Sequence, residues 1–347
     1  MTISSLAALE ARLADYPAIA GRVRFGVGAL GGLGSALREV VPSGAKLLLV
    51  VDPALLPLGL ADRARAAARD AGYEVVTFAG FASDPKAEQV DCAAVLARET
   101  GAKAVVGLGG GSALDLAKLA AAAAVAEAPS AAYALMATAL PEAPLPLIAV
   151  PTTSGTGSEV TRTSVYTLAD GAKVWAWGEA LRPARVVLDP ELTVSLPPAV
   201  TVITGVDALV HAIEAATNRR ARPESDRPAL EAIALIVAAL PAALARGSDL
   251  EARGALMAAA CLAGLAIDQV GTGVAHALGH ALGALAGVPH GRAVGLSLAV
   301  ALADNATAAP ERHAAVAGAF GLPAGRGLAL AYAAFLERVG MSRNLAD

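Results

Sequence analysis

The first half of the sequence alternates short apolar runs with helix-forming stretches. Residues 46–51 form one such run, which ends at Asp52, and residues 104–107 form another, which ends at a glycine loop. Continuous apolar runs are typical of strands in a parallel sheet, because both faces of such a sheet are covered and buried. Strands that alternate with helices therefore predict a Rossmann-like α/β domain with a parallel sheet.

The second half has a different pattern. Strand-like runs stop near residue 188, and Ala- and Leu-rich helical periodicity takes over. We therefore predict two domains, an α/β domain over residues 1–193 and an all-helical domain over residues 194–347. Expected strands lie at 22–28, 46–53, 74–78, 104–107 and 147–150, and expected helices at 34–41, 59–71, 86–99, from 113 on, 198–218, 226–246, 250–267, 272–285, 292–304 and 311–319.

The glycine loop after residues 104–107 is the candidate cofactor site. Gly109, Gly110, Gly111 and Ser112 follow a predicted strand and precede a predicted helix, so free backbone N–H groups and the positive end of the helix dipole would face an anion such as a pyrophosphate. A tight strand-to-helix turn would use the same glycines. The order also departs from the usual dinucleotide fingerprint, in which an acidic residue follows the glycines by about 20 residues.

Two further strand ends point to the same ligand class. Asp52 could accept hydrogen bonds from an adenosine ribose and would repel a 2'-phosphate, which favours NAD over NADP. Its alternative is an ordinary Asp-Pro turn. Residues 151–158 place several hydroxyls and glycines after another strand, where open α/β sheets bind ligands, although a solvated turn would have a similar composition.

Histidine and aspartate spacing in the helical half predicts a metal site. Four of the five histidines fall in two apolar helical segments. Asp207 and His211 are four residues apart, so they share one helix face. His276 and His280 lie in a later segment, and His290 follows a break at Pro289. One carboxylate and three imidazoles suit Fe(II) or Zn(II) rather than Mg²⁺ or Ca²⁺. We predict Asp207, His211, His276 and His290 as ligands and His280 as a nearby proton-transfer group; a hydrogen-bonded core histidine is the alternative for any one of them.

Composition narrows the choice of partners and compartment. The net charge is −4, and no basic cluster is present, which argues against a nucleic-acid partner. The mean hydropathy is +0.56, but the apolar windows are Ala-rich and interrupted by charges and prolines, so we expect buried helices and no membrane partner. Two distant cysteines, Cys92 and Cys261, and the lack of a signal-peptide pattern predict a cytoplasmic protein.

Taken together, these segments resemble the iron-containing (group III) alcohol dehydrogenases over roughly residues 22–340. The matching pieces are 109–112 with Asp115 and Lys118, 151–161, 189–192, 205–215 and 276–291. The resemblance implies a dehydroquinate synthase-like fold, with an N-terminal NAD(P)-binding domain and a C-terminal helical domain, and a homodimer. It implies Fe(II), or Zn(II) in its place, on Asp207, His211, His276 and His290, and a place near the nicotinamide for His280. It also implies cofactor contacts by Asp52, Gly109, Gly110, Gly111, Ser112, Asp115, Thr152, Thr153, Thr156 and Lys173.

Two departures from the family pattern bear on the substrate. The sequence ends at Asp347, where the family usually continues for several more helices, so we expect the surface under those helices to be exposed or covered by a partner subunit. Residues 261–272 carry no aromatic residue and have Asp268 and Gln269 where relatives often have Asn. The exact substrate is therefore not predicted.

The function predicted from these features is an NAD(P)-linked interconversion of a small primary alcohol and its aldehyde or ketone. The metal would polarise the substrate oxygen as a Lewis acid while a hydride passes to the nicotinamide, and the active site is expected between the two domains. Asp207 argues against maleylacetate reductase-like relatives, which typically have Asn there. Glycerol dehydrogenase-like zinc enzymes and, less closely, an NAD-using lyase or cyclase stay open as alternatives.

Overall fold

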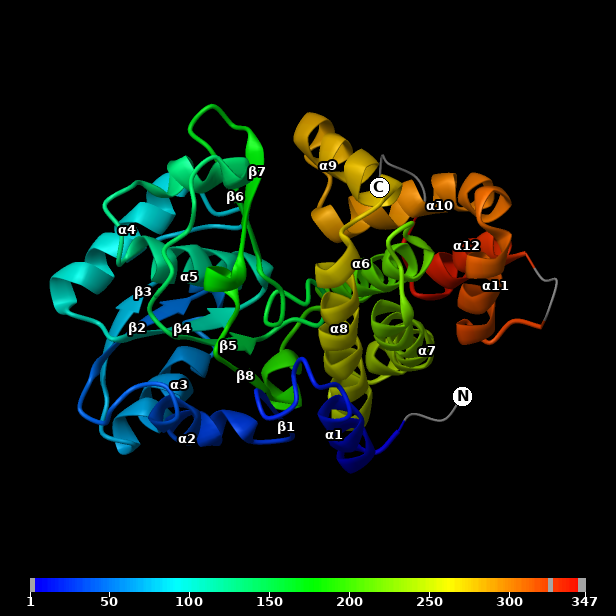
Figure 1. The fold of residues 1–347 in the computed structure, drawn as a ribbon. Helices are drawn as coiled ribbons and strands as arrows, with labels where there is room; N and C mark the ends of the chain where they lie inside the picture. The colour runs from blue at the N-terminus through cyan, green and yellow to red at the C-terminus, as the bar shows by residue number, and fades with distance from the viewer. Residues whose placement is uncertain (1–3, 324–326, 343–347) are drawn as a thin grey trace. The chain divides into compact units, whose positions relative to one another are not determined.

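The structure is a computed structural model, and it describes residues 4–323 and 327–342. The chain divides into two compact units, one of residues 14–152 and 158–192 and the other of residues 1–13, 153–157 and 193–347. Residues 1–3, 324–326 and 343–347 of these ranges lie outside the described residues. The predicted domain limits, 1–193 and 194–347, remain a prediction. Figure 1 shows the elements of both units.

The first unit is built on a six-stranded parallel sheet. Its strand order is β1-β8-β5-β4-β2-β3, and an antiparallel hairpin of β6 and β7 stands apart from it. The strands are β1 Val23–Phe25, β2 Lys46–Val51, β3 Glu74–Phe78, β4 Ala104–Gly109, β5 Leu147–Pro151, β6 Thr163–Thr167, β7 Lys173–Trp177 and β8 Arg185–Leu188; the main helices are α2 Leu33–Arg38, α3 Leu60–Asp70, α4 Ala87–Thr100 and α5 Gly111–Ala123. The predicted α/β fold class is confirmed.

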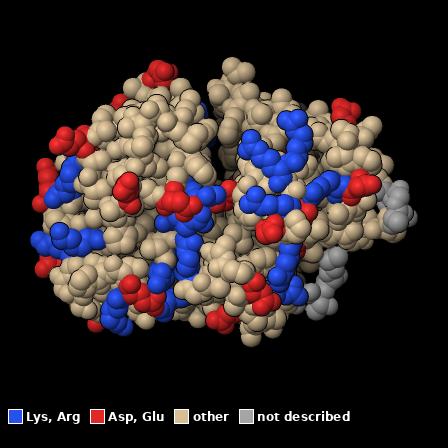
Figure 2. Space-filling model, viewed as in Figure 1, with Lys and Arg blue, Asp and Glu red and all other residues tan. Residues whose placement is uncertain are grey.

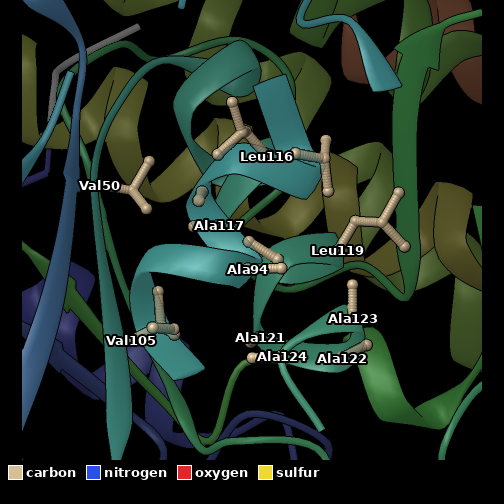
Figure 3. Close-up of a cluster of buried hydrophobic side chains, with 14 of the residues drawn as sticks. Val50, Ala94, Val105, Leu116, Ala117, Leu119, Ala121, Ala122, Ala123 and Ala124 are labelled. Atoms are coloured by element: carbon tan, nitrogen blue, oxygen red, sulfur yellow. The ribbon is translucent and has the colours of Figure 1, made fainter. Parts of the chain in front are cut away.

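Helices cover both faces of this sheet, which explains the continuous apolar run of β2. Leu48 and Val50 pack into a cluster with α4 and α5, whereas Leu47, Leu49 and Val51 pack into a second cluster with α2 and α3. Successive side chains of a strand point to opposite faces, so every position of β2 after Lys46 is buried. The first cluster is drawn in Figure 3, where alanines of α5 lie beside Val50 and Val105.

A buried polar network ties α5 to the β6–β7 hairpin. The Asp115 carboxylate accepts hydrogen bonds from the Ser158 hydroxyl at 2.6 Å and the Val165 N–H at 3.0 Å. The fully buried Lys118 ammonium donates to the Thr161 hydroxyl at 2.9 Å and to the Thr163 carbonyl at 2.8 Å. Buried polar groups require such partners, and these partners hold the hairpin in place.

The second unit is helical. It contains α6 Pro198–Thr217, α7 Pro223–Ala245, α8 Leu250–Val270, α9 Val274–Ala286, α10 His290–Ala308, α11 Pro310–Ala319 and α12 Leu328–Arg338, together with most of α1 Leu6–Ala14. By length and composition alone, α6, α7 and α8 could each cross a membrane. Here they pack against one another, and most residues of α6 and α8 are buried, so core packing accounts for their apolar sequences.

The predicted helices from 198 to 319 are confirmed within a few residues at each end. The largest difference is at the end of α10, which reaches Ala308 and not residue 304, and α10 begins at His290, directly after Pro289. Strand β8, helices α1 and α12 and the β6–β7 hairpin were not predicted.

Over the face of the molecule in Figure 2, acidic and basic side chains are interspersed.

In the helical unit, the backbone of Gly264 on α8 lies close to that of Gly157. A Cβ added to Gly264 on α8 would lie 2.6 Å from the Gly157 carbonyl oxygen. In an open helix a Gly→Ala change stabilises by up to about 1 kcal/mol, but overpacking costs about 1–3 kcal/mol. Gly264→Ala should therefore lower the thermal unfolding midpoint. Gly318→Ala on α11, where an added Cβ meets nothing within 4 Å, should not lower it. Equal effects of the two changes would contradict this packing argument.

Burial of Glu159 generates a prediction about pH. Burial raises the pKa of Glu159 from 4.5 to about 7, so the folded state holds a proton that the unfolded state releases. The stability contributed by this proton is present below about pH 4.5 and is lost as the pH rises from there to about 7. Glu159→Gln should therefore stabilise the protein more at about pH 8 than at about pH 5, by up to about 3 kcal/mol. Chemical denaturation at both pH values measures this difference, and a variant whose gain does not change with pH would count against it.

Candidate functional site

Helix α6 positions the first predicted ligands. Asp207 and His211 are four residues apart and both are buried, with 3% and 8% of their surfaces exposed. The Asp207 Oδ2 atom lies 4.0 Å from His211 Nδ1. Glu214, three residues further along α6, is also buried. The three residues share one side of a largely apolar helix, as their spacing requires.

Helices α9 and α10 bring the other histidines to Asp207. Its Oδ1 atom lies 3.9 Å from His276 Nε2 on α9 and 3.6 Å from His290 Nε2 at the start of α10. Gly291 makes the second approach possible, because a Cβ there would lie 2.1 Å from the Ile203 carbonyl oxygen of α6. The ring centroids of His211 and His276 are 4.5 Å apart.

Three of the four predicted ligands form a compact donor set. One atom each of Asp207, His276 and His290 lies within 4.8 Å of the others. An ion with ligand distances of about 2.0–2.2 Å would have ligand atoms roughly 3–3.5 Å apart, and Asp207 Oδ1 lies 3.6 and 3.9 Å from the two imidazole nitrogens. His211 stands beside this set, with Nδ1 rather than Nε2 toward Asp207, and its role as the fourth ligand stays a prediction.

Unpartnered buried atoms show that this donor set fits a cation. Asp207 Oδ1, His211 Nδ1 and His276 Nε2 are buried and have no hydrogen-bond partner among the described residues. A buried polar atom without a partner costs about 1–3 kcal/mol, and more when it is charged. Two of these atoms face each other, so a divalent cation between them would satisfy both.

The protonation states also suit a cation. Burial, followed by the neighbouring His276, lowers the pKa of His211 to about 3, so this imidazole is neutral at neutral pH and keeps a lone pair for a metal. Burial raises the pKa of Glu214, but the hydrogen bond with His276 and backbone N–H groups outweigh it and lower the pKa overall. Glu214 is therefore an anion beside the histidines.

His280 and Glu214 flank the donor set in different ways. His280 is exposed on α9, and its ring centroid lies 5.3 Å from that of His290 and 6.2 Å from that of His276. Its predicted proton-transfer role is compatible with this position and stays a prediction. Glu214 was not predicted as a site residue from the sequence; its spacing of three from His211 on an apolar helix was the available signal.

In the α/β unit, the glycine loop lies directly beside Asp52. Gly109 has φ +153°, and a Cβ there would lie 2.5 Å from the Ala113 Cβ and 3.0 Å from the Asp52 Cβ. Helix α5 begins after Gly110, which provides no side-chain cap, so the first N–H groups of α5 have no capping side chain there. The Asp52 carboxylate accepts the Ala54 N–H at 3.0 Å, as in an Asp-Pro turn.

The remaining predicted cofactor residues are placed as follows. Lys173 pairs with Asp84 at 2.6 Å, and the Asp84 N–H donates to the Ser112 hydroxyl at 3.3 Å, which puts Lys173 near the start of α5. The Thr152 N–H donates to the Gly109 carbonyl at 3.0 Å. Asp115 faces the hairpin network described above, whereas Thr153 and Thr156 are half-buried and belong to the helical unit. None of these positions tests a cofactor contact, so the contacts stay predictions.

Comparison with known proteins gives the family. Residues 20–190 match the family described as iron-containing alcohol dehydrogenase, and residues 201–347 match the C-terminal domain of the Fe-containing alcohol dehydrogenase family. Long-chain-alcohol dehydrogenase 1 of Geobacillus thermodenitrificans is 42% identical over 264 residues, which is 75% of this chain and 67% of that protein.

Solved structures agree. A 1,3-propanediol oxidoreductase superposes with a TM-score of 0.90 at 34% identity, over 94% of this chain and 87% of that one. Sulfoacetaldehyde reductase from Bifidobacterium kashiwanohense, solved in complex with NAD+, superposes with a TM-score of 0.88 at 33% identity, over 93% and 85%. The chain therefore belongs to the iron-containing alcohol dehydrogenase family and is an NAD(P)-linked alcohol–aldehyde oxidoreductase.

Proposed function

We propose that this protein uses NAD and a divalent metal to interconvert a small primary alcohol and its aldehyde by hydride transfer. The convergence of buried, unpartnered Asp207 Oδ1 and His276 Nε2 with His290 carries the proposal. A member of an iron-containing dehydrogenase family that retains this donor set has the groups that metal-dependent chemistry requires.

Different residues of the chain have different roles in this reaction. Asp207, His211, His276 and His290 would hold Fe(II) or, alternatively, Zn(II), since one carboxylate and three imidazoles suit either ion. Such an ion, when bound, supplies Lewis acidity to the substrate oxygen. Burial of Asp207 keeps water away from its carboxylate and strengthens its attraction for a cation. His280 is exposed, so its ring nitrogens can exchange a proton with solvent.

The glycine loop and Asp52 support NAD rather than NADP as the cofactor. The N–H groups at the start of α5 would take the pyrophosphate, and the nicotinamide ring supplies the hydride acceptor. Asp52 lies against Gly109, where its negative charge would repel a 2'-phosphate and its oxygens would accept ribose hydroxyls. A relative solved with NAD+ supports the same choice.

The names of the relatives support primary alcohols and aldehydes as substrates. They include a choline dehydrogenase, an NAD-dependent methanol dehydrogenase, a 1,3-propanediol dehydrogenase and a sulfoacetaldehyde reductase, and each of these names contains a primary alcohol or an aldehyde. We further propose a cytoplasmic homodimer. The two free cysteines support the compartment, and light scattering of the purified protein tests the dimer.

Asp207→Ala tests the metal site. The variant should contain no stoichiometric Fe or Zn by elemental analysis and should lose at least about 100-fold in turnover, because the anionic ligand is gone. NAD binding measured by calorimetry should stay near that of the unchanged protein. Asp304→Ala, an exposed aspartate on α10, is the matched control and should keep both metal and activity. An active, metal-replete Asp207→Ala would refute the metal mechanism, and an absence of NADH formation with any primary alcohol would refute net alcohol oxidation.

Asp52→Asn tests the choice of cofactor. Asparagine keeps the N-cap that Asp52 gives to Ala54 but removes the charge that opposes a 2'-phosphate. The ratio of kcat/KM for NAD to that for NADP should fall about tenfold or more, which corresponds to about 1.4 kcal/mol. Asp62→Asn, an exposed position on α3, should leave the ratio unchanged. If both variants keep the original ratio, Asp52 does not set the preference.

A further inference from the structure

Glu214 is a buried carboxylate of the helical unit that accepts several hydrogen bonds. It lies on α6, seven residues after Asp207, with 5% of its surface exposed. Both of its oxygens are used. Oε1 accepts the Ala275 N–H at 2.6 Å and the His276 N–H at 3.4 Å, and Oε2 accepts the Gly273 N–H at 2.8 Å.

These contacts make Glu214 the cap of helix α9. The first N–H groups of a helix have no partner within the helix, and Gly273 at the N-cap position has no side chain to offer. A carboxylate from α6 takes that role, and its charge interacts favourably with the positive end of the α9 dipole. A Cβ at Gly273 would lie 2.8 Å from Glu214 Oε1, so the glycine permits the close approach.

The same carboxylate also contacts a predicted metal ligand directly. Glu214 Oε2 lies 2.6 Å from His276 Nδ1. An ionised carboxylate only accepts hydrogen bonds, so the imidazole nitrogen that faces it, Nδ1, carries a proton. In the neutral imidazole the lone pair is then on Nε2. That Nε2 atom is buried, has no hydrogen-bond partner among the described residues and lies 3.9 Å from Asp207 Oδ1.

We propose that Glu214 is a positioning residue that fixes the tautomer and orientation of His276 for metal binding, an inference that rests on the metal site proposed above. Carboxylates that orient a metal-binding histidine in this way typically change metal affinity 10–100-fold when replaced. Because the capping contacts and the Nδ1 contact belong to one carboxylate, the start of α9 and the direction of the His276 lone pair are set together.

Glu214→Gln tests the proposal on the purified full-length protein. Glutamine keeps the size but places an NH₂ donor against N–H donors. The affinity of the metal-free protein for Co²⁺ and Zn²⁺, measured by competition with a chromophoric chelator, should fall about 10–100-fold, and the visible spectrum of the Co²⁺ form should change. Glu231→Gln on α7, whose carboxylate pairs with Arg12 at 3.0 Å, is the matched control and should bind Co²⁺ like the unchanged protein.

Different results would overturn the role of Glu214 and the metal site itself. A folded Glu214→Gln, shown by circular dichroism, with unchanged Co²⁺ affinity and spectrum overturns the role of Glu214. Failure of the unchanged protein to bind Co²⁺ or Zn²⁺ overturns the metal site itself. Nitrogen-15 NMR of histidine in the unchanged metal-free protein distinguishes the two neutral tautomers of His276 and needs no variant. We expect the neutral imidazole to carry its proton on Nδ1, and a neutral imidazole with its proton on Nε2 alone overturns the inference.

Discussion

Asp207 places a carboxylate inside the helical unit, where Oδ1 has no hydrogen-bond partner among the described residues. A buried charge is expensive unless another charge or polar group compensates it, so the surrounding elements must bring compensating groups close. Gly291 lets α10 begin against α6, which brings His290 near Asp207. Gly279 lets α9 pack closely on α10, because a Cβ there would lie 2.6 Å from the Val294 side chain. The cation proposed above would compensate the Asp207 carboxylate at the point where these three helices converge.

The α/β unit meets a similar requirement with protein groups alone. Asp115 is compensated by Ser158, the Val165 N–H and the nearby Lys118, and this network attaches the β6–β7 hairpin to α5. Elsewhere in the same unit Asp189 accepts the N–H groups of Gly28, Leu30 and Glu191. Carboxylates whose oxygens are filled by backbone and hydroxyl donors support the fold, whereas Asp207, with a bare oxygen, is available to a ligand.

Much of the fold could be predicted because its elements carry their own periodicity. The runs of β2 and β4 indicated a sheet buried on both faces, and the two hydrophobic clusters on either side of β2 explain that pattern. Helices α6 to α11 were predicted from apolar spacing alone. Strand β8 and the β6–β7 hairpin were not, because each is short and β6 and β7 depend on pairing with each other and on contacts with α5.

The sequence by itself determined the fold class, the glycine loop and the candidate ligands, since strand pattern, helical spacing and the rarity of histidine are properties of the chain in order. Only the tertiary structure decided which of those groups meet. It showed that Asp52 lies against Gly109, that His290 reaches Asp207 and that Asp115 faces the hairpin. It also revealed the contact between Glu214 and His276, 62 residues apart. Contacts between distant residues depend on how helices pack, and no local pattern encodes that packing.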